Sequence, residues 1–216
     1  MIRSLRHFIT KFDQIQKDRN TPIVGVDGAS ASGKSTIADK LKELDDRVIV
    51  VHMDDFYRPS EEQKDIDLEL IGANFDWERV RKQVLTPLTE NKFGRYQRYD
   101  WETDKLAEWH DVPTDGIIIV EGCFSIRNEL LPFYDVRIWV DSPKQTSLER
   151  VVEREQVGAG NRYMWENVYR PAEEKYIEVN RPKENADIVI DGTGKAADIS
   201  KYEVNIIYES DRWLNI

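Results

Sequence analysis

The stretch that decides the fold of this chain is Gly28-Ala29-Ser30-Ala31-Ser32-Gly33-Lys34-Ser35. It matches the pattern G-x-x-x-x-G-K-[S/T], in which a glycine-rich loop curls its backbone N–H groups around a phosphate. An apolar run from Ile23 to Val26 precedes the stretch, and helix-spaced apolar residues follow it from Ser35 to Leu44. This order turns the positive end of the helix dipole toward the loop. The sequence therefore predicts a phosphate-binding loop between a strand and a helix.

Two side chains of the loop have expected roles of their own. The Lys34 ammonium would place a point charge on the β- and γ-phosphates of a nucleotide, and the Ser35 hydroxyl would reach Mg²⁺. The glycines supply backbone conformations that other residues avoid. We expect a nucleotide to contact the whole loop and the start of the helix, namely Gly28, Ala29, Ser30, Ala31, Ser32, Gly33, Lys34, Ser35 and Thr36.

Working outward, short aliphatic runs alternate with helical patterns. Runs that are apolar at nearly every position are typical of parallel strands covered on both faces. We expect an α/β fold with a five-stranded parallel sheet from residues 23–26, 48–51, 117–120, 136–140 and 187–190. Helices on both faces are expected at about 3–17 and at 35–44, 77–88, 143–155 and 165–179. Residues 57–72 read as a mobile polar loop, and 203–208 could form a late strand.

Length and charge limit the classes of protein. The 216 residues suit a single domain, 1–216, with a small lid at about 150–165. The net charge of −10 argues against nucleic acid as a partner. Because there is no 18-residue apolar run, no apolar leader and only one cysteine, Cys123, we expect no membrane partner, no internal disulfide and a cytoplasmic location.

Acidic residues follow two of the predicted strands. Asp54 and Asp55 come directly after the second strand, and Glu121 ends the third. The carboxyl ends of parallel strands form the ligand crevice of such sheets. Asp54 or Asp55 could take a proton from an acceptor hydroxyl or could cap a helix, and Glu121 could hold Mg²⁺ or face solvent.

Arginines form a spaced set in the expected lid. Arg150 and Arg154 lie four residues apart on one helix face, and Arg162 follows a glycine-containing segment. Such arginines could close on a transferring phosphoryl group and exclude water. The alternative is a solvated helix face that pairs with neighbouring glutamates.

Phosphate-loop proteins include GTPases, motor and transporter ATPases, and small-molecule kinases, and the sequence helps to choose among these classes. A guanine-reading N-K-x-D element is not found, since Asn91-Lys92 is followed by Phe93-Gly94. A motor or transporter ATPase usually belongs to a larger machine. The small size therefore favours a kinase of small molecules.

Over about residues 22–191 the chain resembles the uridine kinase family, near its phosphoribulokinase and nicotinamide riboside kinase branches. The order and spacing of several short elements carry the resemblance. They are the phosphate loop, Met53-Asp54-Asp55-Phe56-Tyr57, Asn74-Phe75-Asp76, Tyr99-Asp100, Glu121-Gly122, the series Leu148, Arg150, Arg154 and Glu155, and Pro171-Ala172 with Tyr176.

The resemblance implies a P-loop kinase fold and a role for each matching residue. Asp54 is implied as the base that activates a 5′-hydroxyl and as a neighbour of Mg²⁺, which Ser35 and Glu121 would also approach. Asp76 is implied to bind the ribose hydroxyls. Further implied roles are nucleoside contacts from Tyr57, Phe75 and Tyr99, and catalytic phosphate contacts from Lys34, Arg150 and Arg154, with Arg154 also reaching the acceptor.

Three departures from the family pattern concern the acceptor. Asp104 stands five residues after Tyr99, where uridine-cytidine kinases carry a base-reading histidine. Met53 replaces a glutamine, and the lid segment around residues 157–162 is loosened. The phosphoryl-transfer elements therefore match the family better than the base-reading pocket does.

The expected reaction is transfer of the γ-phosphoryl group of ATP, as its Mg²⁺ complex, to the 5′-hydroxyl of uridine or cytidine. One alternative is a kinase of another hydroxylated metabolite, such as nicotinamide riboside, pantothenate or a sugar phosphate. Another is a regulatory protein that binds nucleotide without catalysis. Members of the family are often oligomeric, so a homo-oligomer is an open expectation.

Overall fold

The five predicted parallel strands are consecutive neighbours in one sheet. The computed structural model describes residues 1–18, 20–64 and 70–216. Within these residues the sheet order is β1-β9-β8-β7-β2-β6-β3. Its strands are β1 (Ile2–Ser4), β2 (Ile23–Asp27), β3 (Val48–His52), β6 (Ile117–Glu121), β7 (Val136–Asp141), β8 (Ile188–Asp191) and β9 (Glu203–Glu209).

The prediction of a five-stranded parallel sheet is wrong in the number of strands, because the described sheet has seven. β9 pairs antiparallel with β8, and β1 pairs antiparallel with β9. Both added strands lie at one edge and are partly exposed, so they lack the continuous apolar character of buried strands. The late strand expected at 203–208 is confirmed as β9.

Burial on both faces explains the uninterrupted apolar runs. In β6, Ile118 and Val120 pack into the core on one face of the sheet, whereas Ile117 and Ile119 pack into the core on the other. Successive side chains of a strand point to opposite faces, so a strand between two cores needs apolar residues at every position. All four side chains are completely buried.

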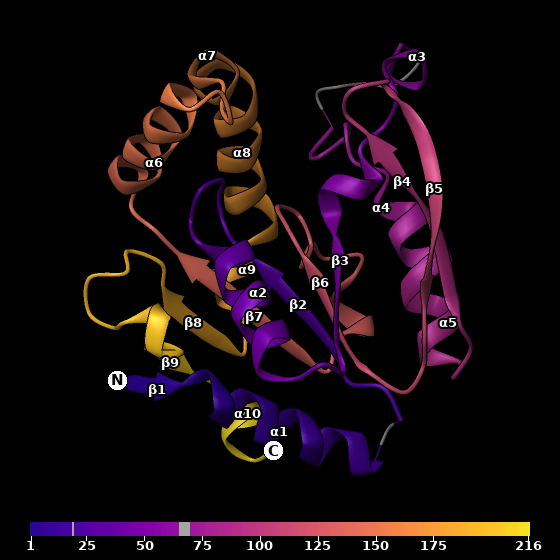
Figure 1. The fold of residues 1–216 in the computed structure, drawn as a ribbon, viewed down its shortest axis with the longest axis vertical. Helices are drawn as coiled ribbons and strands as arrows, with labels where there is room; N and C mark the ends of the chain where they lie inside the picture. Colours follow the sequence, from indigo (N-terminus) through magenta and orange to yellow (C-terminus); the bar gives the residue numbers. More distant parts are fainter. Residues whose placement is uncertain (19, 65–69) are drawn as a thin grey trace.

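Helices cover both faces (Figure 1). The α-helices are α1 (Leu5–Asp18), α2 (Lys34–Leu44), α3 (Ser60–Gln63), α4 (Trp77–Arg79), α5 (Thr86–Thr89), α6 (Lys144–Gln156), α7 (Arg162–Met164), α8 (Arg170–Asn180), α9 (Pro182–Asn185) and α10 (Asp211–Leu214). Two π-helical segments are η2 (Val80–Leu85) and η4 (Trp165–Tyr169). The 3₁₀ segments are η1 (Met53–Phe56), η3 (Leu131–Phe133) and η5 (Ile199–Lys201).

Most predicted helices are found, with shifted bounds. The helix expected from about residue 3 begins at Leu5, because Arg3 and Ser4 belong to β1. The helix expected at 77–88 runs from α4 through η2 to α5. In the predicted polar loop at 57–72 the structure places α3, and the part of that loop at 65–69 lies outside the described residues.

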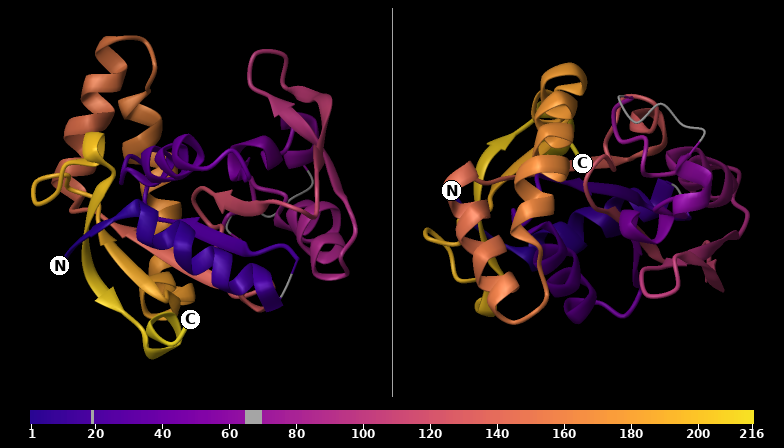
Figure 2. Two further views of the ribbon diagram at one scale, coloured as in Figure 1. Left: turned by 60° about the horizontal axis from the view of Figure 1, so that its bottom comes forward. Right: turned by 90° about the horizontal axis from the view of Figure 1, so that it is seen from above.

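Two arms project from the same edge of the sheet (Figures 1 and 2). The helical arm, residues 144–180, contains α6, α7, η4 and α8. The hairpin arm, residues 77–112, contains α4, η2, α5 and the antiparallel pair β4 (Gly94–Asp100) and β5 (Lys105–Val112). This hairpin was not predicted, because its strands carry polar residues between Tyr96 and Tyr99 and are buried on one face only.

The sheet order places the phosphate loop between the arms. β2 lies between β6 and β7, and all three strands run parallel. The loop after β2 therefore shares the carboxyl edge of the sheet with the ends of β3 and β6, which is where ligands bind in such folds. No helix of the described residues is long and apolar enough to cross a membrane.

Candidate active site

The loop after β2 has the backbone geometry that its glycines predict. Gly33 has φ of +103° and caps α2, and Ala31 has φ of +60°. A Cβ atom at Gly28 would lie 2.5 Å from Ser32 Oγ and 2.6 Å from the Val140 carbonyl oxygen, so only glycine fits there. The buried Ser32 hydroxyl has no hydrogen-bond partner among the described residues. A tight loop with an unpaired donor at the start of a helix fits a bound phosphate group.

Lys34 is the buried cation of this loop. Its side chain reaches back along the loop, with Nζ 3.5 Å from the Ala29 carbonyl oxygen. Burial lowers the pKa of the Lys34 ammonium, but the surrounding acidic groups, Glu121 and Asp54 among them, outweigh burial and raise that pKa above its usual range. Lys34 is therefore charged at neutral pH.

Ser35, Glu121 and His52 form a chain of hydrogen bonds at the end of β6. The Ser35 hydroxyl donates to Glu121 Oε1 at 2.9 Å, and His52 Nδ1 donates to Glu121 Oε2 at 2.9 Å. Burial raises the pKa of Glu121, but the His52 hydrogen bond and the Lys34 charge bring it below its usual value. A hydroxyl beside an ionised carboxylate fits Mg²⁺, which is usually held by one or two carboxylates together with substrate phosphates.

Asp54 follows β3 in η1, near this group. It is exposed toward the space between the arms. Even so, the dense protein around its carboxyl raises its pKa, while the Lys34 charge lowers it by less. Its neighbour Asp55 is tied down instead, because Asp55 Oδ2 accepts a hydrogen bond of 2.9 Å from the Tyr96 hydroxyl. Of the two predicted candidates for a base, the structure leaves Asp54 available.

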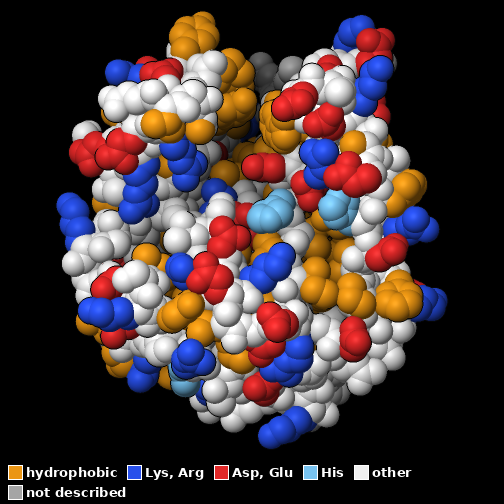
Figure 3. Space-filling model, viewed as in Figure 1, with side chains coloured by type: hydrophobic (Ala, Val, Ile, Leu, Met, Phe, Trp, Pro, Cys, Tyr) orange, Lys and Arg blue, Asp and Glu red, His pale blue; other side chains and the backbone are white. Residues whose placement is uncertain are grey.

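A cavity of about 310 Å³ opens beside the loop, between the two arms, and we call it the aromatic cavity. The surface is hollowed in this region (Figure 3). Its polar walls include Ser30, Asp54 and Glu173, and its aromatic walls include Tyr57, Phe75 and Trp101. The ring centroids of Tyr57 and Trp101 are 4.5 Å apart. Such a cavity suits a small, partly flat molecule held near the loop.

Three residues predicted to contact an acceptor lie outside the lining of this cavity, namely Asp76, Tyr99 and Arg154. Asp76 Oδ2 accepts from Arg58 Nη1 at 3.0 Å, and Asp76 Oδ1 accepts from the Arg79 N–H at 3.1 Å, so Asp76 caps α4. The Tyr99 hydroxyl donates to Asp104 Oδ1 at 2.7 Å. Tyr99 packs behind Tyr57, with ring centroids 5.4 Å apart.

A second cavity, of about 360 Å³, lies on the other side of the phosphate loop. We call it the glycine-loop cavity, because its walls include Gly33, Gly192 and Gly194. Arg150 and Arg154 also line it. Arg150 donates to the Ala31 carbonyl oxygen at 2.9 Å and to the Thr193 carbonyl oxygen at 3.1 Å. Arg150 therefore joins the phosphate loop to the segment that follows β8.

Asp27 is a buried carboxylate beside the phosphate loop that sequence reasoning missed. It is completely buried at the end of β2 and accepts from the Gly28 N–H at 2.7 Å, the Ile126 N–H at 3.0 Å and the Tyr176 hydroxyl at 2.7 Å. Burial raises the pKa of Asp27 to about 6 against these hydrogen bonds. A lone carboxylate at the end of an apolar strand was the available signal.

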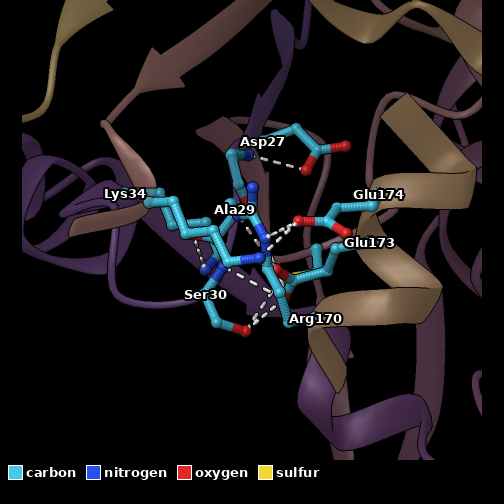
Figure 4. A network of polar contacts seen from close by, with 10 residues as sticks. Asp27, Ala29, Ser30, Lys34, Arg170, Glu173 and Glu174 are labelled. Carbon is cyan, nitrogen blue, oxygen red and sulfur yellow. Dashed lines mark hydrogen bonds and ion pairs between the residues drawn. The ribbon is translucent and has the colours of Figure 1, made fainter. Parts of the chain in front are cut away.

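Glu173 was also missed, and it touches the phosphate loop from α8. Its Oε1 atom accepts two hydrogen bonds from Ser30, one from the backbone N–H at 3.0 Å and one from the hydroxyl. Figure 4 shows Ser30 and Glu173 facing each other, with Arg170 and Glu174 beside them. The thiol of Cys123, whose pKa is raised by burial, lies 3.4 Å from the same Glu173 oxygen.

Comparison with known proteins agrees with this arrangement. Residues 23–199 match the model of the phosphoribulokinase/uridine kinase family. The chain belongs to this family. It is therefore a kinase that transfers a phosphoryl group to an alcohol, and membership implies the use of ATP.

Individual relatives share less than a third of their residues with the chain. It is 30% identical over 184 residues to uridine-cytidine kinase B of Dictyostelium discoideum, which covers 78% of this chain and 73% of the relative. It is 28% identical over 194 residues to a uridine kinase of Staphylococcus aureus, with coverages of 82% and 91%. The structure of a possible uridine kinase from Bacillus stearothermophilus superposes with a TM-score of 0.62 at 26% identity, covering 85% of this chain and 98% of that one.

Proposed function

We propose that this kinase phosphorylates the 5′-hydroxyl of a pyrimidine nucleoside, uridine or cytidine, with ATP as its Mg²⁺ complex. The observation that carries the proposal is the position of Asp54. It lies at the wall of the aromatic cavity and beside the Lys34 and Glu121 side chains. The relatives named as uridine kinases support the choice of nucleoside.

The two cavities divide the substrates between them. The glycine-loop cavity, next to the start of α2, would take the nucleoside end of ATP, and its phosphates would lie along Gly28–Thr36. The aromatic cavity would take the acceptor, with its flat base near Tyr57, Phe75 and Trp101. The acceptor hydroxyl would then lie at the wall of the aromatic cavity that the phosphate loop forms with Ser30.

At that wall the chain's own residues would carry out the transfer. Lys34, charged and buried, would stabilise the negative charge that develops on the phosphoryl oxygens. Asp54 would accept the proton of the acceptor hydroxyl, and Ser35 with Glu121 would hold Mg²⁺. Bound Mg²⁺ would neutralise part of the phosphate charge. The arginines of the helical arm, Arg150 and Arg154, would approach the phosphates if the predicted lid at about 150–165 closes.

Asp76 has a defined part in this proposal. Asp76 lies outside the lining of the aromatic cavity, so it would bind the ribose hydroxyls only if the ribose extends toward it, and it would share its carboxylate with Arg58. A carboxylate that accepts two hydrogen bonds from a vicinal diol binds more strongly than a neutral acceptor. The site would then select ribose over 2′-deoxyribose. The Asp104 carboxylate is engaged by Tyr99 and the Ser60 N–H, so we expect little direct base reading from it.

The test is a comparison of kcat/KM for uridine, cytidine, 2′-deoxycytidine, nicotinamide riboside and pantothenate. We expect cytidine and uridine to exceed the others, and Asp76→Ala to reduce the preference for cytidine over 2′-deoxycytidine by about tenfold or more. If pantothenate is the best acceptor, the nucleoside assignment is wrong while the kinase assignment stands. Asp104→Asn serves as the control that should leave the ribose preference unchanged.

A further inference from the structure

The aromatic cavity carries an unusual balance of charge. Two carboxylates line it, Asp54 and Glu173. Among the described residues that line it there is no lysine and no arginine. Its remaining walls are mostly aromatic or small. A molecule that enters this cavity therefore meets two carboxylates and no cationic side chain among the described lining residues.

Glu173 is the more buried of these two carboxylates. Its residue is only 3% exposed. Oε1 accepts from the Ser30 N–H, whereas Oε2 is buried and has no hydrogen-bond partner within the described part of the chain. Arg170 Nη1 forms an ion pair with Oε2 at 4.0 Å, which is beyond hydrogen-bond distance. Arg170 instead donates to Glu174 at 2.8 Å.

An unfilled carboxylate oxygen in this position favours particular ligands. Leaving a buried acceptor without a donor costs free energy, and a ligand that supplies the donor recovers it. In surroundings of low dielectric constant, a carboxylate also repels an anion more strongly than it would in water. Both effects point toward acceptors that carry hydroxyl or amino groups and no negative charge.

The cations near the cavity are engaged elsewhere. Arg58 donates to Asp76 and to the Ala73 carbonyl oxygen. Lys34 lies in the phosphate loop among Glu121, Asp54 and Glu173, and its ammonium group would pair with the phosphates of bound ATP. An anionic acceptor would therefore find no free counterion at the described walls.

We propose that Glu173 makes the acceptor site selective for charge: the site takes a neutral or cationic hydroxylated acceptor that donates a hydrogen bond to Glu173, and it rejects acceptors that carry a phosphate or carboxylate. This inference rests on the proposed function, because it assumes that the aromatic cavity is the acceptor site. It goes further by assigning the choice of acceptor charge to one residue of α8.

The experiment measures binding of three nucleosides that differ in charge at the same position. They are uridine, 5′-amino-5′-deoxyuridine and uridine 5′-carboxylic acid, the last two of which carry their charge on the side of the acceptor that faces Ser30 and Glu173, titrated calorimetrically with a non-hydrolysable ATP analogue and Mg²⁺ present. We expect the cation to bind at least about tenfold more tightly than the anion, with uridine in between. The Glu173→Gln side chain has nearly the same shape. In this variant the ratio of the two affinities, cationic over anionic nucleoside, should be about three- to tenfold smaller.

Glu174→Gln is the matched control. It removes the same charge one position along α8, but Glu174 pairs with Arg170 and Lys144 and does not line the cavity. The affinity ratio of the cationic to the anionic nucleoside should be the same in this variant as in the unmodified protein. Equal binding of all three nucleosides, or the same ratio in Glu173→Gln, would overturn the charge selection while leaving the kinase a nucleoside kinase. Binding of none of them would overturn the proposed function and this inference together. If the predicted binding ratio is found but a separate assay with ATP shows no transfer to uridine, the charge selection stands and the proposed function is wrong.

Discussion

The glycine-loop cavity and the aromatic cavity flank the same phosphate loop, but their walls are built differently. Three glycines line the first, Gly33, Gly192 and Gly194, and the Arg150 side chain donates to two backbone carbonyl oxygens there. The second is formed by side chains from η1, the hairpin β4–β5, the segment after β6 and α8. Backbone can bind phosphate in many sequences, whereas side chains decide which acceptor fits.

This difference separates what is general from what is particular in the molecule. The phosphate loop and its glycines match a pattern shared by many proteins. The aromatic cavity includes Glu173 and Trp101, which no short pattern in the chain identified as ligand contacts. The predictions below test each side of the loop separately, in decreasing order of expected effect.

Asp54→Asn should have the largest effect on catalysis. It keeps the size of the side chain but removes the proposed base, so kcat should fall about 10²- to 10⁴-fold with a small change in acceptor affinity. Because the pKa of Asp54 is raised, kcat of the unmodified enzyme should fall as the pH drops through a value above that of an ordinary Asp. Steady-state kinetics against pH measure both. If Asp55→Asn proves the more damaging change, the roles of the two neighbours are reversed.

Lys34→Ala tests the phosphate loop itself. Loss of this buried charge removes stabilisation of the phosphoryl group, so kcat/KM should fall at least about a hundredfold. The release of ADP reports the loss for every acceptor alike, because the defect lies on the nucleotide side. Turnover at the unmodified rate would show that the loop does not bind phosphate in the way proposed.

Asp27, at the start of the phosphate loop, should make the free energy of unfolding depend on pH. Its pKa is raised from 3.8 to about 6, so its contribution to the free energy of unfolding is fully present below pH 3.8 and is lost as the pH rises to about 6. The shift corresponds to about 3 kcal/mol. Asp27→Asn cannot titrate. The difference in unfolding free energy, unmodified protein minus variant, should therefore decrease between pH 4 and pH 6 in denaturant titrations; a flat difference contradicts the burial argument.

Arg150→Ala should have the smallest effect of this set. It breaks the bonds that join the phosphate loop to the segment after β8, so the KM for ATP should rise about tenfold, while the KM for the acceptor stays the same. The exposed Glu149→Ala on the same helix is the control. If only the KM for the acceptor changes, Arg150 acts at the acceptor site, and its assignment to the nucleotide site is wrong.

The same division explains how much the sequence could predict. Strands such as β6 were found because burial on both faces requires continuous apolar residues. Asp54 and Glu121 could be singled out because Glu121 ends a strand and Asp54 lies just after one, and parallel strands bring their ends to one edge. These features are local in the chain, so a pattern of neighbouring residues is enough to identify them.

The features that were missed depend on distant contacts. Glu173 meets Ser30 across 143 positions of sequence, and Asp27 meets Tyr176 across 149. The β4–β5 hairpin packs one face only, so its mixed polar sequence resembles a loop. Asp76 was expected at the ribose, but its pairing with Arg58, 18 positions away, could not be read from the element Asn74-Phe75-Asp76.

The most direct test of the central claim follows the phosphoryl group itself. ATP labelled at the γ-phosphate is incubated with the protein, Mg²⁺ and uridine or cytidine, and the labelled products are separated and identified. Our account predicts that the label appears at the 5′-position of a nucleoside monophosphate, and that Asp54→Asn abolishes this product. Label found only in inorganic phosphate, at a rate that no acceptor changes, would contradict the account and identify a protein that hydrolyses nucleotide without an acceptor.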